Sequence, residues 1–295
     1  MLNIDGSFGE GGGQLVRNAV ALSAITGEPV TITRIRAARH NHGLAAQHIA
    51  AIKAVEFTCD AECRGVSLGS GTIEFFPQEL KSREVSVAVG TAGSIPLVIQ
   101  AWLPVALCAG GILHISGGTE VLMSPTIDYL DHVLGSVLRS SGAEITLDIH
   151  KRGYFPEGGG EVTVRVDKKK ISPIVPDDDR DHTCLIFSCS SNLPDHVTER
   201  QASAADACLC PALGEPCRIT LDHRTGPSTG SSCTVCRGAK GGIALGKRGL
   251  PAEEVGRRAA NALLTEIKNP GSVDIHLSDQ LLVPLALFGG SFTTS

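Results

Sequence analysis

The sequence begins with a glycine-rich loop in which one carboxylate stands among the glycines. Residues 4–20 read IDGSFGEGGGQLVRNAV, and Glu10 is the acidic residue inside the glycine run. Glycines ahead of a helix let backbone N–H groups approach an anion, and the helix N-terminus favours negative charge. Glu10 fits such a phosphate site if Mg²⁺ bridges it to phosphate oxygens, which hard divalent cations bind together with carboxylates. The alternative is a tight strand–helix turn with Glu10 at an exposed helix start.

Basic residues gather in the segment that follows this loop. Arg17 lies one turn into the predicted helix, where it would balance the charge of Glu10 and the phosphates. From residue 30 to residue 55 the chain has no acidic residue, and it carries three histidines together with Arg34, Arg36, Arg39 and Lys53. Such a stripe can bind phosphates even on a protein with a net charge of −5, and its alternative is a solvated face.

The hydrophobic pattern divides the chain into related units that must position these residues. A loop, an amphipathic helix over 14–25, Gly27 and a strand over 30–35 form the first unit. The same order returns at 90–115 and opens again in HLSDQLLVPLALFGGSFTTS, the last twenty residues. Between these copies lie units of a helix and two strands, namely GLAAQHIAAIKAVEFT with VSLG and TIEFF, and TIDYLDHVLGSVLRSSG with EITLDI and EVTVRV. The pattern predicts α/β repeats, the third of which stops after its first strand.

Polar residues interrupt the apolar helices at related places in the repeats. Gln100 stands in IPLVIQAWLPVAL, and Asp279 and Gln280 open the helix of the third copy. If the helix starts of the three copies converge, these residues meet Glu10 at one centre. The alternatives are that Gln100 satisfies a backbone group and that Asp279 caps its helix. His276 is a candidate phosphoryl-transfer nucleophile, a purine contact or a satisfied histidine at a strand end.

The chain contains a segment of different composition between the second and third copies. After the charged stretch KKKISPIVPDDDRD, residues 182–268 predict strands at CLIFSCS, CRITLD, SCTVC and GGIALG, and helices from Asp195 and from Pro251 to Ile267. Pro251, Glu253 and Glu254 suit a helix N-terminus. We therefore expect a large repeat domain over 1–181 and 269–295 with a small inserted α/β domain over 182–268. The string PEGGGEV at 156–162 resembles the opening loop but leads into alternating valines, so its glycines predict a turn before a strand.

Composition places the protein among soluble globular chains. Of its 295 residues 42% are hydrophobic, and no apolar run is long enough to span a bilayer. The start of the chain shows no targeting peptide, so we expect a cytoplasmic protein with no membrane partner. Seven of the ten cysteines fall in 184–236. Their spacing favours reduced thiols over a metal site or a redox pair, since Cys233-x-x-Cys236 has no second pair at ribbon-like spacing.

Six strings together resemble the RNA 3′-terminal phosphate cyclases. They are DGSFGEGGGQLVR, RAARHNHGLAAQH, GTAGSIPLVIQ, RGYFPEGGGEV, GPSTG and HLSDQL, in this order from Ile4 to Phe292. The resemblance implies a large domain of three repeats like that of enolpyruvyl transferases, with a small inserted domain. It also implies that ATP activates an RNA 3′-phosphate, which closes to a 2′,3′-cyclic phosphate. The enzyme is first adenylylated on a histidine, and AMP then passes to the RNA phosphate before the 2′-OH displaces it.

The resemblance also assigns roles to individual residues. It makes Glu10 a contact of Mg²⁺ or another divalent cation, and it places Arg17, Arg39 and Gln47 on the side of the nucleotide or the RNA phosphate. The ATP contacts that it implies are Gln100, His276, Leu277, Ser278, Asp279 and Gln280. Recognition of a 2′-OH beside a phosphate would select RNA over DNA.

The resemblance stops short of the nucleophile. The adenylylated histidine of the family lies after the strand of the third copy, and none of the ten histidines of this chain has that position. We therefore expect no catalytic nucleophile in this chain and place it beyond Ser295. An alternative is a non-catalytic relative that acts in ribosome or RNA assembly. Enolpyruvyl transfer shares the repeats but does not account for the basic stripe.

Overall fold

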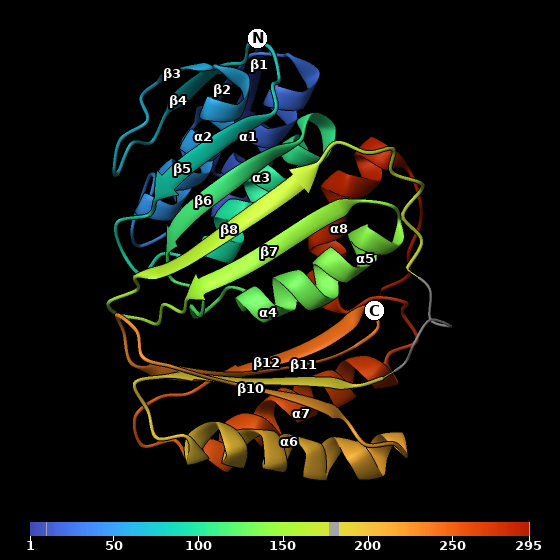
Figure 1. The fold of residues 1–295 in the computed structure, drawn as a ribbon. Coiled ribbons are helices and arrows are strands. Elements are labelled where there is room, and N and C mark those ends of the chain that lie inside the picture. The colour runs from blue at the N-terminus through green and yellow to red at the C-terminus, as the bar shows by residue number, and fades with distance from the viewer. Residues whose placement is uncertain (10, 177–182, 295) are drawn as a thin grey trace. The chain divides into compact units, whose positions relative to one another are not determined.

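The structure, a computed structural model, describes residues 1–9, 11–176 and 183–294 (Figure 1). Contacts divide the chain into two compact units. Unit 1 comprises Met1–Gly117, Ala143–His150 and Glu161–Lys169, and unit 2 comprises Gly118–Gly142, Lys151–Gly160 and Lys170–Ser295. The described residues form three four-stranded mixed sheets with helices, which confirms the predicted α/β fold. The predicted borders of the large and inserted domains remain predictions. No described helix is long and apolar enough to cross a membrane.

The first sheet of unit 1 is built from the first repeat. Its strands, in sheet order, are β1 (Leu2–Asp5), β2 (Val30–Thr33), β4 (Ile73–Phe76) and β3 (Glu62–Arg64). β1 and β2 run parallel, and the other neighbours are antiparallel. The repeat also contributes two helices, α1 (Gly13–Thr26) and α2 (Ala46–Cys59). α1 ends at Gly27, whose left-handed conformation is the glycine-type cap expected there.

The second sheet of unit 1 repeats this topology. Its strands, in sheet order, are β5 (Arg83–Ala88), β6 (Gly111–Gly117), β8 (Gly160–Asp167) and β7 (Glu144–Lys151). The first two strands are again parallel, and the connection between them is α3 (Ile95–Ala109). The two sheets thus share one strand order, which is the structural form of the repeat seen in the sequence.

Unit 2 contains the third sheet and the remaining helices. The sheet order is β10 (Arg218–Arg224), β9 (Leu185–Ser191), β11 (Gly230–Arg237) and β12 (Lys240–Leu245). α6 (His196–Leu213) and α7 (Ala252–Lys268) contact this sheet and each other (Figure 1). The unit also holds α8 (Ile275–Phe288) and the helical run α4 (Ile127–Tyr129), η1 (Leu130–Leu134) and α5 (Gly135–Ser140), whose middle turn is a π-helix. Glu253 and Glu254 lie in the first turn of α7, as predicted.

Three local predictions are wrong. VSLG forms a turn instead of a strand. The reason is that α2 ends at Asp60, which has the left-handed conformation, and the residues directly after it already pair with β4 as β3. Residues 291–294 form no strand, and only a single bridge joins Gly290 to Ile174. α8 begins at Ile275, four residues before the predicted opening at Asp279. The reason is Asp274, whose carboxylate accepts hydrogen bonds from the backbone N–H groups of the first turn.

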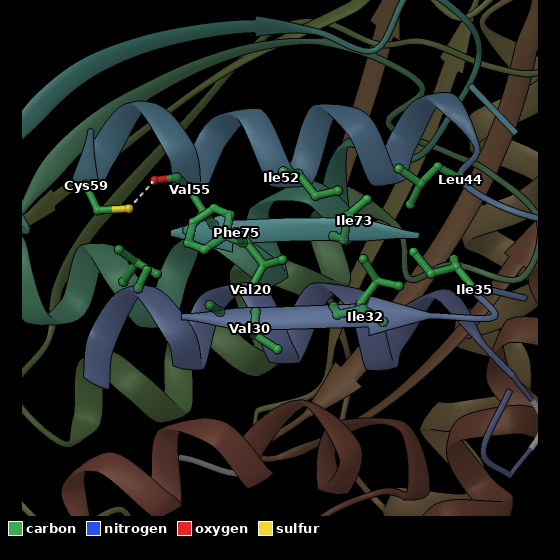
Figure 2. Packing of buried hydrophobic residues seen from close by; sticks show 14 residues of the cluster. Val20, Val30, Ile32, Ile35, Leu44, Ile52, Val55, Cys59, Ile73 and Phe75 are labelled. Atoms are coloured by element: carbon green, nitrogen blue, oxygen red, sulfur yellow. Dashed lines mark hydrogen bonds between the residues drawn. The ribbon is translucent and has the colours of Figure 1, made fainter. Parts of the chain in front are cut away.

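The first repeat has a closed hydrophobic core. Side chains of α1 and α2 pack against those of β2 and β4, and the fully buried members include Val20, Ile32, Ile52 and Phe75 (Figure 2). Large apolar residues alternate along both strands, which is why one face of each strand enters the core. This core fixes the positions of the N-terminal ends of α1 and α2.

Replacing the central aromatic residue of this core tests the packing. We expect Phe75→Ala to lower the free energy of unfolding by about 3–5 kcal/mol, because Phe75 has 0% exposure and its removal leaves a cavity. Phe57 on α2 is 43% exposed, and Phe57→Ala should change stability by about 0.5 kcal/mol or less. Denaturant unfolding of both variants measures the difference. Equal effects would contradict the packing described.

Candidate functional site

The glycine-rich loop leaves the N-terminus of α1 open to an anion. Glu10 lies outside the described residues, so its predicted metal contact remains a prediction. On either side of it, Gly9 and Gly11 have φ values of 61° and 59°, which side chains other than glycine rarely adopt. Gly12 precedes α1 in an extended conformation, and the first helical turn has neither a side-chain cap nor an acidic residue. Its N–H groups are therefore available to a bound anion.

Arg17 is a buried cation that has no protein partner in the described part of the chain. Its side chain is on the inner side of α1 with 8% exposure, and burial lowers the pKa of the guanidinium from 12.5 to about 10. No carboxylate or carbonyl among the described residues accepts a hydrogen bond from it. A buried charge without a partner is costly, so a bound anion would stabilise Arg17 at this position. The sequence predicted Arg17 as a phosphate contact, and its environment fits that role.

His48 lies against the first residue of α1. It is 3% exposed, and its Nδ1 accepts a hydrogen bond from the backbone N–H of Ala45 at 2.9 Å. Burial, followed by the charges of Arg17 and Arg36, lowers the pKa of the imidazole to about 4. The ring is therefore neutral near pH 7, and its proton is on Nε2. A Cβ at Gly13 would overlap Nε2, so only glycine allows this contact.

The basic stripe does not form one uniform face. Arg34 pairs with Asp5 through Nε at 3.0 Å, and Arg36 donates from Nη1 to the carbonyl of Gly43 at 3.0 Å. Both arginines have positive φ, at 51° and 52°, so they shape the turn after β2. Arg39 is exposed on the same segment. Arg34 and Arg36 thus have protein partners, and phosphate binding by the stripe remains a prediction.

Gln47 links the N-termini of the helices. Its Oε1 accepts a hydrogen bond from the backbone N–H of Ser94, the N-cap of α3, at 3.1 Å. Gln47 is on the first turn of α2, whose neighbour His48 touches Gly13 of α1. The N-terminal ends of α1, α2 and α3 therefore meet in unit 1, as the repeats predicted for two of the three copies.

The amide group of Gln100 on α3 has a buried Nε2 without a hydrogen-bond partner in the described chain.

The third predicted contact segment lies at the start of α8 in unit 2. His276 and Asp279 are exposed, Leu277 is fully buried, and the Ser278 hydroxyl donates to the Ile275 carbonyl. His276 is helical, so the strand-end alternative is wrong. Asp279 is not the cap, because Asp274 fills that role. Gln280 has a buried Oε1 with no partner among the described residues, as Gln100 has a buried Nε2.

The buried N-cap of α8 was not predicted from the sequence. The Asp274 carboxylate accepts hydrogen bonds from the N–H groups of His276, Leu277 and Gly241, and from the Tyr129 hydroxyl at 2.7 Å. Burial raises the pKa of Asp274, and these donors oppose the rise. Aspartate just before an apolar helix is the N-cap signal that would have revealed it.

A second missed feature is a buried charge cluster around Arg152 in the string RGYFPEGGGEV. The guanidinium donates to Glu120 at 2.8 Å, to both oxygens of Asp128 at 2.7 and 2.9 Å, and to Asp222 at 2.8 Å. One guanidinium thus donates hydrogen bonds to three carboxyl groups. Burial raises the pKa of Glu120 to about 8, with Arg152 opposing and Asp128 assisting the rise. The cluster ties together distant segments of unit 2, and the glycines after it form a turn before β8, as predicted.

The ten cysteines carry free thiols. Burial raises the pKa of Cys233 to about 12, and that of Cys236 also lies above its usual range. Their thiols therefore stay protonated near pH 7. The described residues contain no group of three or more histidine, cysteine or acidic side chains arranged to hold a metal ion. Cys184 and Cys233 are fully buried in the hydrophobic core of unit 2, and Cys208 and Cys217 pack against this core.

Comparison with known proteins places these features in a family context. The pattern of the family described as RNA 3′-terminal phosphate cyclase matches residues 8–295. A relative of that name from Methanococcoides burtonii is 47% identical, over 99% of this chain and 89% of the relative. One from Pyrococcus furiosus is 45% identical over 98% and 87%, and one from Archaeoglobus fulgidus is 42% identical over 100% and 90%.

The raised pKa of Glu120 makes stability depend on pH. The neutral carboxyl stabilises the fold fully below the unfolded pKa of about 4.5, and this contribution is lost as pH rises toward about 8. Glu120→Gln cannot ionise. We expect its stability relative to the wild type to increase by up to about 1.4 kcal/mol per pH unit between pH 5 and 8. Urea titrations across this range measure the difference, and a constant difference would show that Glu120 is ionised in the fold.

Proposed function

Because the chain belongs to the RNA 3′-terminal phosphate cyclase family, we propose that it converts an RNA 3′-terminal phosphate to a 2′,3′-cyclic phosphodiester with ATP. The observation that supports this most directly is the buried guanidinium of Arg17, which has no partner among the described residues and lies beside the open N-terminus of α1. A dianionic phosphate monoester matches that environment in charge and in hydrogen-bonding capacity. An RNA end with a 3′-hydroxyl can form hydrogen bonds but does not supply this charge.

The residues around Arg17 account for how the RNA phosphate is held. The guanidinium and the N–H groups of the first turn of α1 donate to its oxygens, and the Nε2–H of His48 adds a neutral donor. Gln47 accepts from the Ser94 N–H through its Oε1, and we propose that its Nε2 donates to the ligand. Arg39, exposed on the neighbouring segment, contributes positive charge toward the RNA backbone. Binding and orientation of this kind provide most of the catalysis in phosphoryl and nucleotidyl transfer.

ATP contacts are proposed at Gln100 and at the segment from His276 to Gln280. The orphaned Nε2 of Gln100 and the orphaned Oε1 of Gln280 are the observations that fit a bound ligand, because buried amide atoms normally have partners. Glu10 would hold a divalent cation, which when bound offsets the charge of the triphosphate. Leu277 contributes to the apolar core, so its contact with a nucleotide would have to come from its backbone.

The proposed reaction has three steps. A histidine nitrogen attacks the α-phosphorus of ATP and pyrophosphate leaves. The RNA 3′-phosphate oxygen then takes AMP from the histidine, which gives an RNA–adenylate. Finally the vicinal 2′-OH attacks the RNA phosphorus, its proton is lost and AMP leaves with the bridging oxygen. Arg17 and His48 hold the RNA phosphate while its charge redistributes. We assign none of the ten histidines of this sequence to the role of the nucleophile.

The proposed partners are RNA 3′ ends, and the proposed location is the cytoplasm. Ten free thiols fit a reducing compartment. The alternative from the sequence is a non-catalytic function in ribosome or RNA assembly. That function does not require a phosphate-binding cation such as the buried Arg17.

Labelled ATP separates the two functions and locates the nucleophile. A chimaera would continue past Ser295 with the corresponding segment of the Methanococcoides burtonii relative. Incubation with ATP labelled in the α-phosphate should give an acid-labile AMP adduct on the chimaera and none on the present chain. With RNA 3′-phosphate, the chimaera should form an end resistant to phosphatase. Absence of both products from a folded chimaera would favour the non-catalytic function.

Two substitutions of His48 separate its structural role from its ligand role. His48→Asn keeps an acceptor near Nδ1 for the Ala45 N–H but removes the Nε2–H, whereas His48→Gln extends a donor toward the Nε2 position. We expect His48→Asn to weaken binding of a 3′-phosphate oligoribonucleotide about tenfold, the loss of one hydrogen bond to a charged group. His48→Gln should bind more tightly than His48→Asn.

Fluorescence anisotropy measures both affinities, with the same RNA ending in a 3′-hydroxyl as the control. The affinity for the 3′-hydroxyl RNA should be alike in the wild type and both variants. If His48→Asn weakens the two RNAs equally, His48 does not contact the phosphate.

A further inference from the structure

The glycine-rich loop carries an exposed aromatic side chain. Phe8 is 80% exposed, although burial of a phenylalanine ring is normally favourable. Its backbone is held on both sides, because Phe8 N–H donates to the Asp5 carbonyl at 3.2 Å and the Phe8 carbonyl accepts from Gly11 N–H at 3.1 Å. Among the described residues its ring takes part in no stacking or cation–π contact. The ring is thus presented to solvent by a fixed turn.

The loop that holds Phe8 lies directly on the arginine-rich segment. The Gly6 N–H donates to the Thr33 carbonyl at 2.7 Å, and a Cβ on Gly6 would overlap the backbone of Ile35. A Cβ on Gly11 would lie 3.9 Å from the Cα of Arg36. These contacts place the backbone of the loop that presents the ring against the arginine-rich segment. A ring beside basic residues is the arrangement with which proteins bind single-stranded nucleic acids, since the charges attract the backbone and the ring stacks on a base.

We propose that Phe8 stacks on the nucleobase at the 3′ end of the bound RNA, a subsite for an unpaired base next to the phosphate site. The inference rests on the proposed function, because the 3′-phosphate must bind at the N-terminus of α1. Phe8 is five residues before Gly13, the first residue of that helix, and five residues span at most about 17 Å when fully extended. The turn between Phe8 and Gly11 shortens this path, so a terminal nucleotide reaches both places.

The chemistry of stacking predicts what this subsite recognises. Every base has a π face, so the ring accepts all four bases and adds affinity without reading sequence. It requires an unstacked terminal base, which favours single-stranded 3′ ends over ends paired in a duplex. The phosphate site then selects RNA ends that carry a 3′-phosphate. Phe8 selects ends whose terminal base is unpaired.

A terminal 2-aminopurine reports the stacking directly. An RNA with a 3′-phosphate and 2-aminopurine in its last nucleotide should lose fluorescence on binding to the wild-type chain. Phe8→Ala should leave most of the fluorescence and weaken binding about tenfold, within the range measured for base–aromatic stacking. Phe8→Trp should retain both properties. Phe155→Ala, which removes a phenylalanine that is 69% exposed in unit 2, is the matched control and should behave as the wild type.

An RNA with an abasic last nucleotide completes the test. The wild type and Phe8→Ala should bind it with equal affinity, because there is no base for the ring to contact. If Phe8→Ala binds the intact RNA as tightly as the wild type, with the same fluorescence, the stacking proposal is wrong while the phosphate site stands. If no variant prefers a 3′-phosphate to a 3′-hydroxyl end, the proposed function fails and the stacking proposal fails with it.

Discussion

A positive charge enclosed by a hydrophobic helix interface is the constraint on which the site depends. Arg17 lies on the buried side of α1 beside Val16 and Val20, and the described protein offers it no counter-charge. Hydrophobic packing alone would place an apolar residue there. Among the described residues nothing offsets the electrostatic cost of burying this cation, and a bound anion would offset it. The open first turn of α1 and the neutral ring of His48 add N–H groups without adding a carboxylate.

The repeated fold positions the helices of this site. The two copies differ in the residues at their helix starts, and these differences decide which helix start can bind a ligand. Both sheets of unit 1 have the same strand order and the same parallel first pair. The first copy begins its helix with glycines, which leave the N-terminus open. The second copy begins its helix with Ser94, which caps Leu97 N–H and is held by Gln47. The N–H groups at the start of α1 therefore remain available to a ligand, whereas the start of α3 is capped by Ser94.

Sequence reasoning located the elements with strong periodicity and the residues within motifs. It identified α1, α3 and α7 because apolar residues recur on one face and because glycine or proline marks their ends. It missed β5, in which the buried Val85 and Val87 alternate with exposed residues, and it misplaced β3, whose three residues are too few for a period to show. It also placed the start of α8 at Asp279, although the helix begins at Ile275 after its cap, Asp274.

The role of His48 shows why part of the site could not be predicted. In sequence His48 is one of three histidines in a basic stripe, and His40 and His42 are exposed. What distinguishes His48 is its contact with Gly13, 35 positions earlier, and that contact exists only after α1 and α2 pack. Arg17 was found because its motif is local. The Arg152 cluster was missed for the same reason as His48, because its carboxylates come from segments far apart in sequence.

The most direct test is whether the Arg17 guanidinium binds the 3′-phosphate of RNA. Its Nε–H signal in a ¹H–¹⁵N spectrum can be assigned by its loss in Arg17→Lys and followed during titration with RNA. The account predicts a downfield shift and slower solvent exchange of that signal with an RNA ending in a 3′-phosphate, and no change with the same RNA ending in a 3′-hydroxyl. An Arg17 signal that stays unchanged at saturating 3′-phosphate RNA, or that responds equally to both ends, would contradict it.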